Sequence, residues 1–570
     1  MSKWFHRIIA KYPWWWVVAL IVVIAVIVRC WGFGHNPPSL YWDEMSLLYD
    51  GWSIAETGKD LHGHSWPLVA FESFGDYKPS GYFYLVALSI KLLGLHEWAV
   101  RVPSLVAGIL IVILVGLLSE KMFAGLKWRG WRLSWLVMLV AALNPSLIHL
   151  SHVGFETNVA TMWVLLGVVL LYPTKKRQEK KIDWSMIFGE IALLLAFYTY
   201  HATRVVAPCL GIYLVSWRLW SCWQNQKHNK QWWRACLPTL SLMAGIAMVV
   251  VWPFLFGDKG QLSSRFVETS IFGNQETIIA SNQCREVVGE TLMSRVWCHR
   301  YWFWLREIVS RFTSHLSFDY LALVGDSNGR HSVGWWGILF PWEVIGFWAG
   351  VLWLVEHRKT HLSATIFTCF WLVMGLIPAS ITLATPHLLR SENILPLLLV
   401  IISLGWVRLA SLVTKKWQEY YWIILVVIYL GGAVVWNYYY HSYYRVADAA
   451  WWQDGYREAD EVLARWQELY PQLPVYVTRE MGRPSIYYFW YRQLQPEQVQ
   501  AQAGQEKMDQ GEFVTWSPDN IFFGTGWLPQ EQLFVLSPEE YEALEASEEA
   551  EPITNSAGEV VLLVGHYADE

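Results

Sequence analysis

The sequence is poor in charge and in cysteine, and it has no obvious cofactor motif. Only 16% of its 570 residues are charged, whereas a soluble domain carries roughly a quarter. Its seven cysteines form no Cys-x-x-Cys metal or redox pattern, and the C-terminal part contains no glycine-rich nucleotide loop. Lys and Arg form no basic stripe outside short connectors, so nucleic acid is not expected as a partner. These absences argue against a soluble enzyme or a nucleic acid-binding protein.

Long uncharged apolar runs replace the missing features. Hydrophobic residues make up 54% of the chain, and its 39 Trp and 28 Tyr suit the boundary between lipid and water. We therefore predict an integral membrane protein. Eleven runs are each long enough to cross roughly 30 Å of hydrocarbon; they begin near Trp14, Val102, Leu133, Thr157, Trp184, Thr203, Ala235, Val333, Ala364, Ile394 and Tyr421.

The positive charges predict the orientation of these spans. Almost half of the 43 Lys and Arg residues lie in short connectors that fall on one side when eleven spans are counted. By the positive-inside rule that side, with the N-terminus, is cytoplasmic. Counting the run 80–93 as a further span would move most of these charges outside, so we expect an interfacial or re-entrant helix there.

The expected fold is an all-α polytopic membrane bundle of about 11 transmembrane helices, followed by a small α/β domain outside the cytoplasm. Residues 1–438 form the membrane domain, with outer loops 32–101 and 257–332 and interfacial helices in the first loop. Residues 439–570 form the extracytoplasmic α/β domain of this plasma membrane protein. In it, 457–469 and the acidic stretch 537–550 are expected helices, and 475–477, 521–523 and 560–564 are expected strands. Cys284 and Cys298 share an outer loop, where a disulfide is a hypothesis.

Two outer segments carry the first candidate site residues. Asp43 and Glu44 begin an amphipathic helix that runs to about Thr57. Acids favour helix N-termini for structural reasons alone, but a carboxylate held near the bilayer can also act as a general base or a cation ligand. Lys78, in the sequence Asp76-Tyr77-Lys78-Pro79, is either a snorkelling anchor or a contact for a lipid phosphate.

Other outer turns bring further polar groups to the same membrane face. A lone histidine near a helix end is usually structural. Here several turns bring His, Arg and acidic residues to one membrane face, and this convergence favours a functional site. In the second outer loop, Arg330 and His331 lie in a stretch rich in Gly and Asn that could be only a tight turn. The alternative is that these two side chains contact an anion. Two acids, Glu190 and Glu343, lie inside apolar spans, where placing an acidic side chain costs free energy. This cost indicates a structural or catalytic role for each. For Glu190 we prefer a hydrogen bond between helices. The residues in outer turns are Glu156, His201, Arg204, Arg330, His331, His387 and Arg390.

Several of these motifs, in this order and spacing, resemble the GT-C glycosyltransferase superfamily, in its protein O-mannosyltransferase and aminoarabinose-transferase branch. The resemblance covers roughly residues 1–440. It is carried by Trp42-Asp43-Glu44, Asp76-Tyr77-Lys78-Pro79, Trp98-Ala99-Val100-Arg101-Val102-Pro103-Ser104, Asn144-Pro145, Glu156, Tyr200-His201 with Arg204, Ile377-Pro378-Ala379-Ser380-Ile381-Thr382, Pro386-His387 and Arg390.

The resemblance implies inverting transfer of a hexosyl or pentosyl group from a polyprenyl-phosphate donor to a lipid, glycan or protein on the outer face. Asp43, with Glu44, would be catalytic, and Lys78 would contact the donor phosphate. Ser80 replaces the second proline of the family's Lys-Pro-Pro pattern, and Glu156 relates to an acid after the third span in some relatives. The expected donor-binding set is Asp76, Tyr77, Lys78, Glu156, His201, Arg204, Arg330, His331, His387 and Arg390.

No metal is required by this chemistry, although Asp43 with Glu44 could hold a divalent cation. Two other classes stay open. A transporter or lipid flippase also places polar residues in a helix bundle, but here the polar set lies on one face and the chain has no internal repeat. A non-catalytic scaffold would leave the clustered polar turns unexplained.

Overall fold

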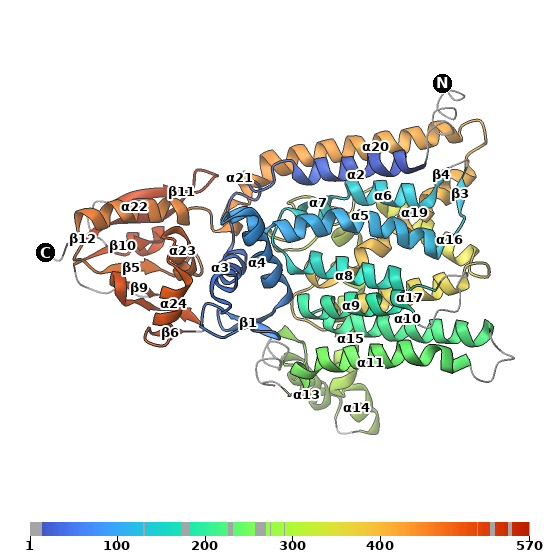
Figure 1. The fold of residues 1–570 in the computed structure, drawn as a ribbon, viewed down its shortest axis with the longest axis horizontal. Coiled ribbons are helices and arrows are strands. Elements are labelled where there is room, and N and C mark those ends of the chain that lie inside the picture. The colour runs from blue at the N-terminus through green and yellow to red at the C-terminus, as the bar shows by residue number, and fades with distance from the viewer. Residues whose placement is uncertain are drawn as a thin grey trace. The chain divides into compact units, whose positions relative to one another are not determined.

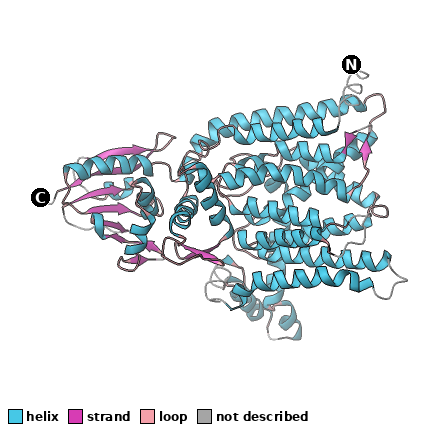
Figure 2. Ribbon diagram, viewed as in Figure 1, coloured by secondary structure: helices cyan, strands magenta, loops and turns pink. Residues whose placement is uncertain are grey.

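The computed structural model is mostly helical, with a β-sheet near the C-terminus (Figures 1 and 2). It forms two compact units. The first, here the helical unit, comprises Met1–Trp31, Ser104–Ser151 and Phe155–Asn437; the second, the mixed unit, comprises Gly32–Pro103, His152–Gly154 and Tyr438–Glu570. The structure describes residues 14–128, 131–173, 182–225, 232–256, 269–273, 275–289, 291–509, 511–524, 531–544 and 550–568.

The helical unit contains a helix in each of the eleven predicted apolar runs. In chain order they are α2 (Trp14–Cys30), α5 (Val102–Met122), α6 (Leu133–Leu143) with α7 (Pro145–Ser151), α8 (Glu156–Leu171), α9 (Trp184–Thr199), α10 (Thr203–Asn225), α11 (Trp232–Phe256), α16 (Glu343–Glu356), α17 (Leu362–Ser380), α19 (Leu395–Leu412) and α20 (Gln418–Tyr439). Consecutive helices from α8 to α11 contact one another and run side by side in Figure 1.

Among the described residues, six helices are long and apolar enough to cross a membrane, or seven if the bent pair α6 and α7 is one span. The pair bends by 58° where Asn144 precedes Pro145, because a residue before proline is kept out of the helical region. The run predicted from Val333 becomes helical only at Glu343, after Pro341, which has no amide hydrogen to donate to a helix. The basic connectors 1–13, 174–181 and 226–231 lie outside the described residues.

Small residues let α16 and α19 pack closely. A Cβ at Gly405 would lie 1.8 Å from the carbonyl oxygen of Gly346, and one at Gly350 would lie 1.9 Å from that of Ile401. No side chain fits at either position, and close backbone approach is the usual basis of helix association in lipid. Glycine is therefore required at this contact.

The two acids inside the apolar runs differ in their surroundings. Glu343 is fully buried; its oxygens accept hydrogen bonds from the Phe340 amide at 2.8 Å and the Tyr429 hydroxyl at 3.0 Å. The Tyr429 oxygen in turn accepts from Trp406 Nε1 at 2.9 Å, so these hydrogen bonds link α16 to α20 and α19. The Oε2 atom of Glu190 is buried with no hydrogen-bond partner among the described residues, which does not support the predicted bond between helices.

Disulfide bonding of Cys284 to Cys298 is present, as hypothesised. It joins α13 (Glu276–Val288) to the end of α14 (Leu292–Trp297), and α13 packs on α15 (Arg300–Ser314). The disulfide closes a short loop, with a sequence separation of 14 residues, and such bonds persist in oxidising compartments, which agrees with the predicted outer position of this segment.

The mixed unit begins with α3 (Trp42–Thr57), which matches the predicted amphipathic helix. A hairpin follows, formed by β1 (Ala70–Ser73) and β2 (Asp76–Pro79). Its two-residue turn, Phe74-Gly75, has positive φ at both positions (56° and 73°), as a type I′ turn requires. The turn fixes the register, which pairs Lys78 with Phe71.

The helix α4 (Gly81–Leu93) confirms the predicted helix after the Lys78 motif. It has 13 residues, which at 1.5 Å per residue is about 20 Å and too short to cross the hydrocarbon core. Its length agrees with an interfacial or re-entrant position.

The C-terminal part is a mixed six-stranded sheet in the order β11-β12-β10-β5-β9-β8, in which β8 (Thr515–Trp516) pairs antiparallel with β9. β5 (Val475–Thr478) lies parallel to both β10 (Gln532–Leu536) and β9 (Ile521–Gly524), whereas β12 (Val560–Tyr567) is antiparallel to β10 and to β11 (Ala550–Thr554). α22 (Tyr456–Leu469) packs on β10 and β12. The predicted helix 457–469 and the three predicted strands are confirmed.

The predicted acidic helix over 537–550 is wrong in extent. Only α25 (Pro538–Glu542) forms, after a capping box between Ser537 and Glu540, and residues 545–549 lie outside the described part. Ala550 already belongs to β11, because pairing with β12 satisfies its backbone in the sheet. Tertiary pairing thus overrides a helical composition.

Residues 32–103 group with the C-terminal part, whereas the sequence places them in the membrane domain. α3 packs on α23 (Pro484–Tyr491) and α24 (Pro496–Gln502). The Tyr49 hydroxyl donates to the Leu494 carbonyl at 2.7 Å, and the Tyr487 hydroxyl donates to the Leu40 carbonyl at 2.8 Å. The domain boundary at 438 stays a prediction.

Candidate active site

Asp43 and Lys78 form an ion pair in the mixed unit. Asp43 lies in the first turn of α3, where the helix dipole favours an acid. Lys78 lies on β2, and its Nζ contacts Asp43 Oδ1. The lysine side chain is only 7% exposed, whereas that of Asp43 is 34% exposed. The pair therefore offers an accessible carboxylate backed by a buried positive charge.

Glu44, the neighbour of Asp43, has a different environment. It is fully buried, and its two oxygens bind the Arg101 guanidinium with Nε–Oε1 at 2.9 Å and Nη2–Oε2 at 3.0 Å. The Gly154 amide also donates to Oε1 at 2.7 Å. Arg101 further donates to the carbonyl oxygens of Pro37 and Ser39. Glu44 thus anchors the start of α3 and is shielded from solvent.

Asp50 is a third acid of this region that the sequence reasoning missed. It is 1% exposed, and its Oδ1 accepts a hydrogen bond from the Leu61 amide at 2.8 Å. Burial, reinforced by the charge of Asp60, raises the pKa of Asp50 well above its ordinary value, although the charge of Lys78 acts in the opposite direction. Asp50 follows Asp43 by seven residues on one helix, and this spacing places both on one face. This seven-residue spacing was the feature of the sequence from which Asp50 could have been predicted as a neighbour of Asp43.

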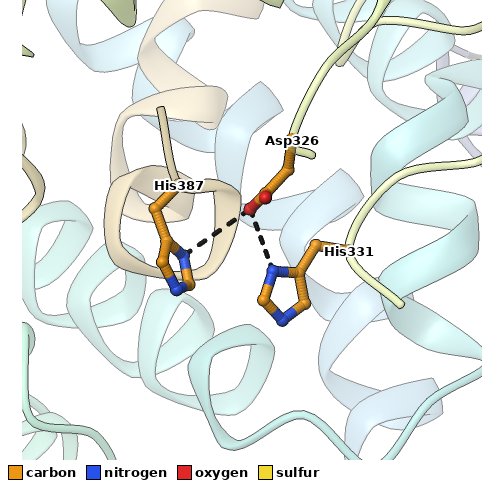
Figure 3. Close-up of side chains that lie close together, drawn as sticks. All are labelled: Asp326, His331 and His387. Carbon is orange, nitrogen blue, oxygen red and sulfur yellow. Dashed lines mark hydrogen bonds and ion pairs between the residues drawn. The ribbon is translucent and has the colours of Figure 1, made fainter. Parts of the chain in front are cut away.

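Asp326, His331 and His387 form a second polar cluster, in the helical unit (Figure 3). Asp326 Oδ2 accepts hydrogen bonds from His331 Nδ1 at 2.9 Å and from the Leu388 amide at 2.8 Å. The Nδ1 atom of His387 lies 3.7 Å from the same oxygen. The three side chains, each buried or nearly so, could hold a metal ion.

The cluster carries a fixed negative charge at Asp326. Burial alone would raise the pKa of Asp326, but the hydrogen bond from His331 and the charges of His331 and His387 outweigh it and lower that pKa to about 2. Burial lowers the pKa of His387 well below its ordinary value. The sequence identified both histidines but missed Asp326, because the stretch Gly325-Asp326-Ser327-Asn328 has an ordinary turn composition.

The remaining predicted site residues lie in both units. In the mixed unit, Asp76 and Tyr77 precede Lys78 on β2, and Asp76 Oδ1 accepts from the Tyr77 amide at 2.8 Å. In the helical unit, Glu156 starts α8 and Arg390 lies in α18 (Leu388–Ser391).

Two further turns of the helical unit place predicted cationic residues. Between α9 and α10, Arg204 Nη1 lies 3.2 Å from His201 Nδ1, and its guanidinium stacks over Phe254 at 5.0 Å. The carbonyl oxygen of Arg330 accepts a hydrogen bond from His149 Nε2 at 2.8 Å. The structure thus brings together Asp43 with Lys78, His201 with Arg204, and His331 with His387.

A small cavity beside the histidine cluster is lined by His331 together with Ser146, His149, Trp336 and Trp436. Its volume of about 10 Å³ is roughly the room that one water molecule needs. The cavity therefore has space for a small polar group and none for a whole sugar-lipid.

Comparison with solved structures identifies the architecture. ArnT from Cupriavidus metallidurans in the apo state aligns over 96% of this chain and 97% of its own, with a TM-score of 0.52 and 13% identity. The same enzyme bound to undecaprenyl phosphate aligns over the same shares with a TM-score of 0.52 and 14% identity. This chain has the ArnT fold. The GT-C resemblance carried by the sequence motifs is confirmed at the level of fold.

A weaker likeness extends to the oligosaccharyltransferase of Archaeoglobus fulgidus in complex with Zn and sulfate, with a TM-score of 0.47 and 13% identity over 83% of this chain and 61% of that one. No protein-family model matches the sequence. No curated protein matches it at the sequence level. The described residues thus combine an ArnT-like fold with six or seven helices that are long and apolar enough to cross a membrane.

Proposed function

We propose that the protein is an inverting glycosyltransferase that moves a sugar from a polyprenyl-phosphate donor to an acceptor on the extracytoplasmic face. The observation that carries the proposal is the pairing of an accessible Asp43 with a buried Lys78. A base and a phosphate-binding cation are the two groups that such a transfer needs from the protein. The ArnT fold supports the class of reaction.

In the proposed reaction, Asp43 accepts the proton of the acceptor hydroxyl as its oxygen attacks the anomeric carbon. The bond from that carbon to the phosphate oxygen breaks, and the electron pair leaves with the polyprenyl phosphate. Lys78 neutralises the phosphate as its charge grows. Before the donor binds, Lys78 is paired with the Asp43 carboxylate. Donor phosphate would draw the ammonium toward itself and leave the carboxylate free to accept the proton of the acceptor hydroxyl.

Topology and donor class support each other. We propose eleven spans with a cytoplasmic N-terminus, a membrane domain over 1–438 and an extracytoplasmic domain over 439–570. On this topology every cytoplasmic connector is too short to bind a nucleotide sugar, so a lipid-linked donor is the better candidate. One of the matched ArnT structures holds undecaprenyl phosphate, a donor-side lipid of this chemical class.

The other outer-face residues receive supporting roles in the proposal. The cationic and histidine side chains and their neighbours would contact the phosphate and the sugar; they are Asp76, Tyr77, Glu156, His201, Arg204, Arg330, His331, His387 and Arg390. Glu44 would position Asp43, because its oxygens are already bound to Arg101 and Gly154. A divalent cation at Asp43 is not needed. The acceptor class remains lipid, glycan or protein.

A transfer assay on the purified chain tests Asp43. Mass spectrometry of surface glycoconjugates from cells with and without the gene identifies the sugar, and a polyprenyl-phosphate carrying that sugar is then the donor. Asp43→Asn should lower the transfer rate by about 10²- to 10⁴-fold, the range of general-base catalysis. Glu551→Gln, which breaks an exposed pair with Arg465, is the control and should keep the activity. Unchanged transfer by Asp43→Asn at equal protein level would remove Asp43 from the chemistry.

The same assay tests the role of Lys78. Lys78→Ala should raise KM for the lipid-linked donor more than KM for the acceptor, because only the donor carries the phosphate. An equal effect on both substrates would instead mark Lys78 as a structural anchor. Movement of lipid across vesicles without any covalent product would favour the rival function, a transporter or flippase.

A further inference from the structure

We propose that Asp326, His331 and His387 form a zinc site (Figure 3). The ligand atoms that they offer all lie within 4.8 Å of one another. Asp326 and His331 come from the turn before α16, whereas His387 comes from the turn before α18, some 56 residues later. A metal there would join two chain segments of the helical unit.

The orientation of His387 argues for a cation between these groups. Its Nδ1 is buried, makes no hydrogen bond among the described residues, and lies 3.7 Å from Asp326 Oδ2. At that distance an N–H would be too far away to donate a hydrogen bond, and a lone pair would face a negative oxygen. A metal ion bound by both atoms removes the conflict, since imidazole nitrogen and carboxylate oxygen are both good ligands.

The distances are close to those of a tetrahedral zinc centre. Zinc bonds of roughly 2.0 to 2.2 Å to nitrogen and oxygen place neighbouring ligand atoms about 3.3 Å apart. The observed separations from Asp326 Oδ2 are 2.9 Å to His331 Nδ1 and 3.7 Å to His387 Nδ1, one on either side of that value. Shifts of less than an ångström would bring both of these pairs to that separation, and the ligand atoms of all three residues already lie within 4.8 Å of one another. His331 Nδ1 would release its proton on binding.

Surrounding hydrogen bonds already hold the ligands in place. Asp326 Oδ1 accepts from the Asn328 amide at 3.0 Å and Oδ2 from the Leu388 amide at 2.8 Å. The His387 amide donates to His315 Nε2 at 3.0 Å, and His315 Nδ1 donates to the Arg311 carbonyl at 2.7 Å. Such outer hydrogen bonds orient metal ligands and set their affinity.

The ligand set selects the metal and leaves room for a further ligand. Two imidazoles and one carboxylate suit zinc and its neighbours better than magnesium or calcium, which prefer oxygen. Three protein ligands leave the fourth position open to water or to an anionic oxygen, the type of ligand that phosphate supplies. A Zn²⁺ with Asp326 would keep one net positive charge beside the cavity that His331 lines.

The test is metal loading of the full chain in detergent. The protein is stripped with a chelator, incubated with ZnCl₂ and desalted, and zinc is then counted by inductively coupled plasma mass spectrometry. We expect about one zinc per wild-type chain and a higher melting temperature after loading. His387→Gln should hold no zinc and show no shift. His566→Gln, which removes an imidazole paired with Glu531 in the C-terminal sheet, is the control and should load like wild type.

Equal zinc in wild type, His387→Gln and His566→Gln, or none in any of them, would overturn the proposal. If His387→Gln does not fold, His331→Gln takes its place. Cobalt(II) gives a second readout, because a four-coordinate site colours the ion by d–d absorption. The bands should be present in the wild type and lost in His331→Gln, and bands of equal strength in both proteins would contradict the site.

Discussion

Replacement of Glu44 by Gln separates the structural from the chemical acid of α3. Glu44 and Arg101 are 0% and 1% exposed and share two hydrogen bonds. Gln would keep the acceptor for the Gly154 amide, but its NH₂ group would face the Arg101 Nη2 donor. Arg101 would then be a buried cation without a counterion, and breaking such a pair costs about 3–5 kcal/mol.

A cost of this size is large against the roughly 5–15 kcal/mol that stabilises a typical domain. At about 2–4 °C per kcal/mol for domains of 150–250 residues, the melting temperature should fall by roughly 6 to 20 °C. Differential scanning fluorimetry of the detergent-solubilised chain, read by tryptophan emission, measures the shift.

Glu97→Gln supplies a matched control in the same unit. Glu97 also pairs with an arginine, Arg457, but the two side chains are 26% and 52% exposed. Exposed pairs contribute about 0–1 kcal/mol, so this variant should melt close to wild type. If Glu44→Gln melts no lower than Glu97→Gln, the buried pair does not anchor α3 and the assignment of Glu44 as a positioning residue is refuted.

Two further predictions concern stability. Asp50→Asn should stabilise the protein increasingly as the pH rises above about 4, the ordinary pKa of Asp in an unfolded chain. Because the pKa of Asp50 is raised in the fold, its favourable contribution to the free energy of unfolding is complete at low pH and is lost as the pH rises. A difference in melting temperature between the two proteins that stays the same at every pH would contradict this. Gly405→Ala should lower the melting temperature, because its Cβ would strike the backbone of Gly346, whereas Gly431→Ala has open space and should not; equal melting of the two variants would show that the α16–α19 contact is not tight.

Much of the fold follows from local sequence patterns. Each apolar run contains a helix, since an uncharged run of this length is stable in lipid only where its backbone hydrogen bonds are internal. The start of α3, the helix after Lys78-Pro79 and the strands β5, β9 and β12 were all predictable from periodicity and turn residues. The acidic stretch near 540 misled, because β11 gains its partners from a strand that lies further along the chain.

The candidate site could be predicted only in part. Asp43, Lys78, His331 and His387 stand out because polar residues in turns next to apolar runs are costly and few. The local sequence does not distinguish Asp326 in this way, because its neighbours are residues that are common in any turn. Its importance comes from contacts with His331 and with the turn at His387, which no spacing rule connects.

The sequence by itself determined that the chain is a membrane protein with helices in its apolar runs, because hydrophobicity, charge and backbone hydrogen bonding act locally along the chain. Only the tertiary structure decided which polar groups meet. In the fold, Glu44 pairs with Arg101, Asp43 pairs with Lys78, and Asp326 pairs with His331 and His387. The energy of a buried charge depends on the partners within a few ångströms, and folding brings those partners from distant parts of the chain.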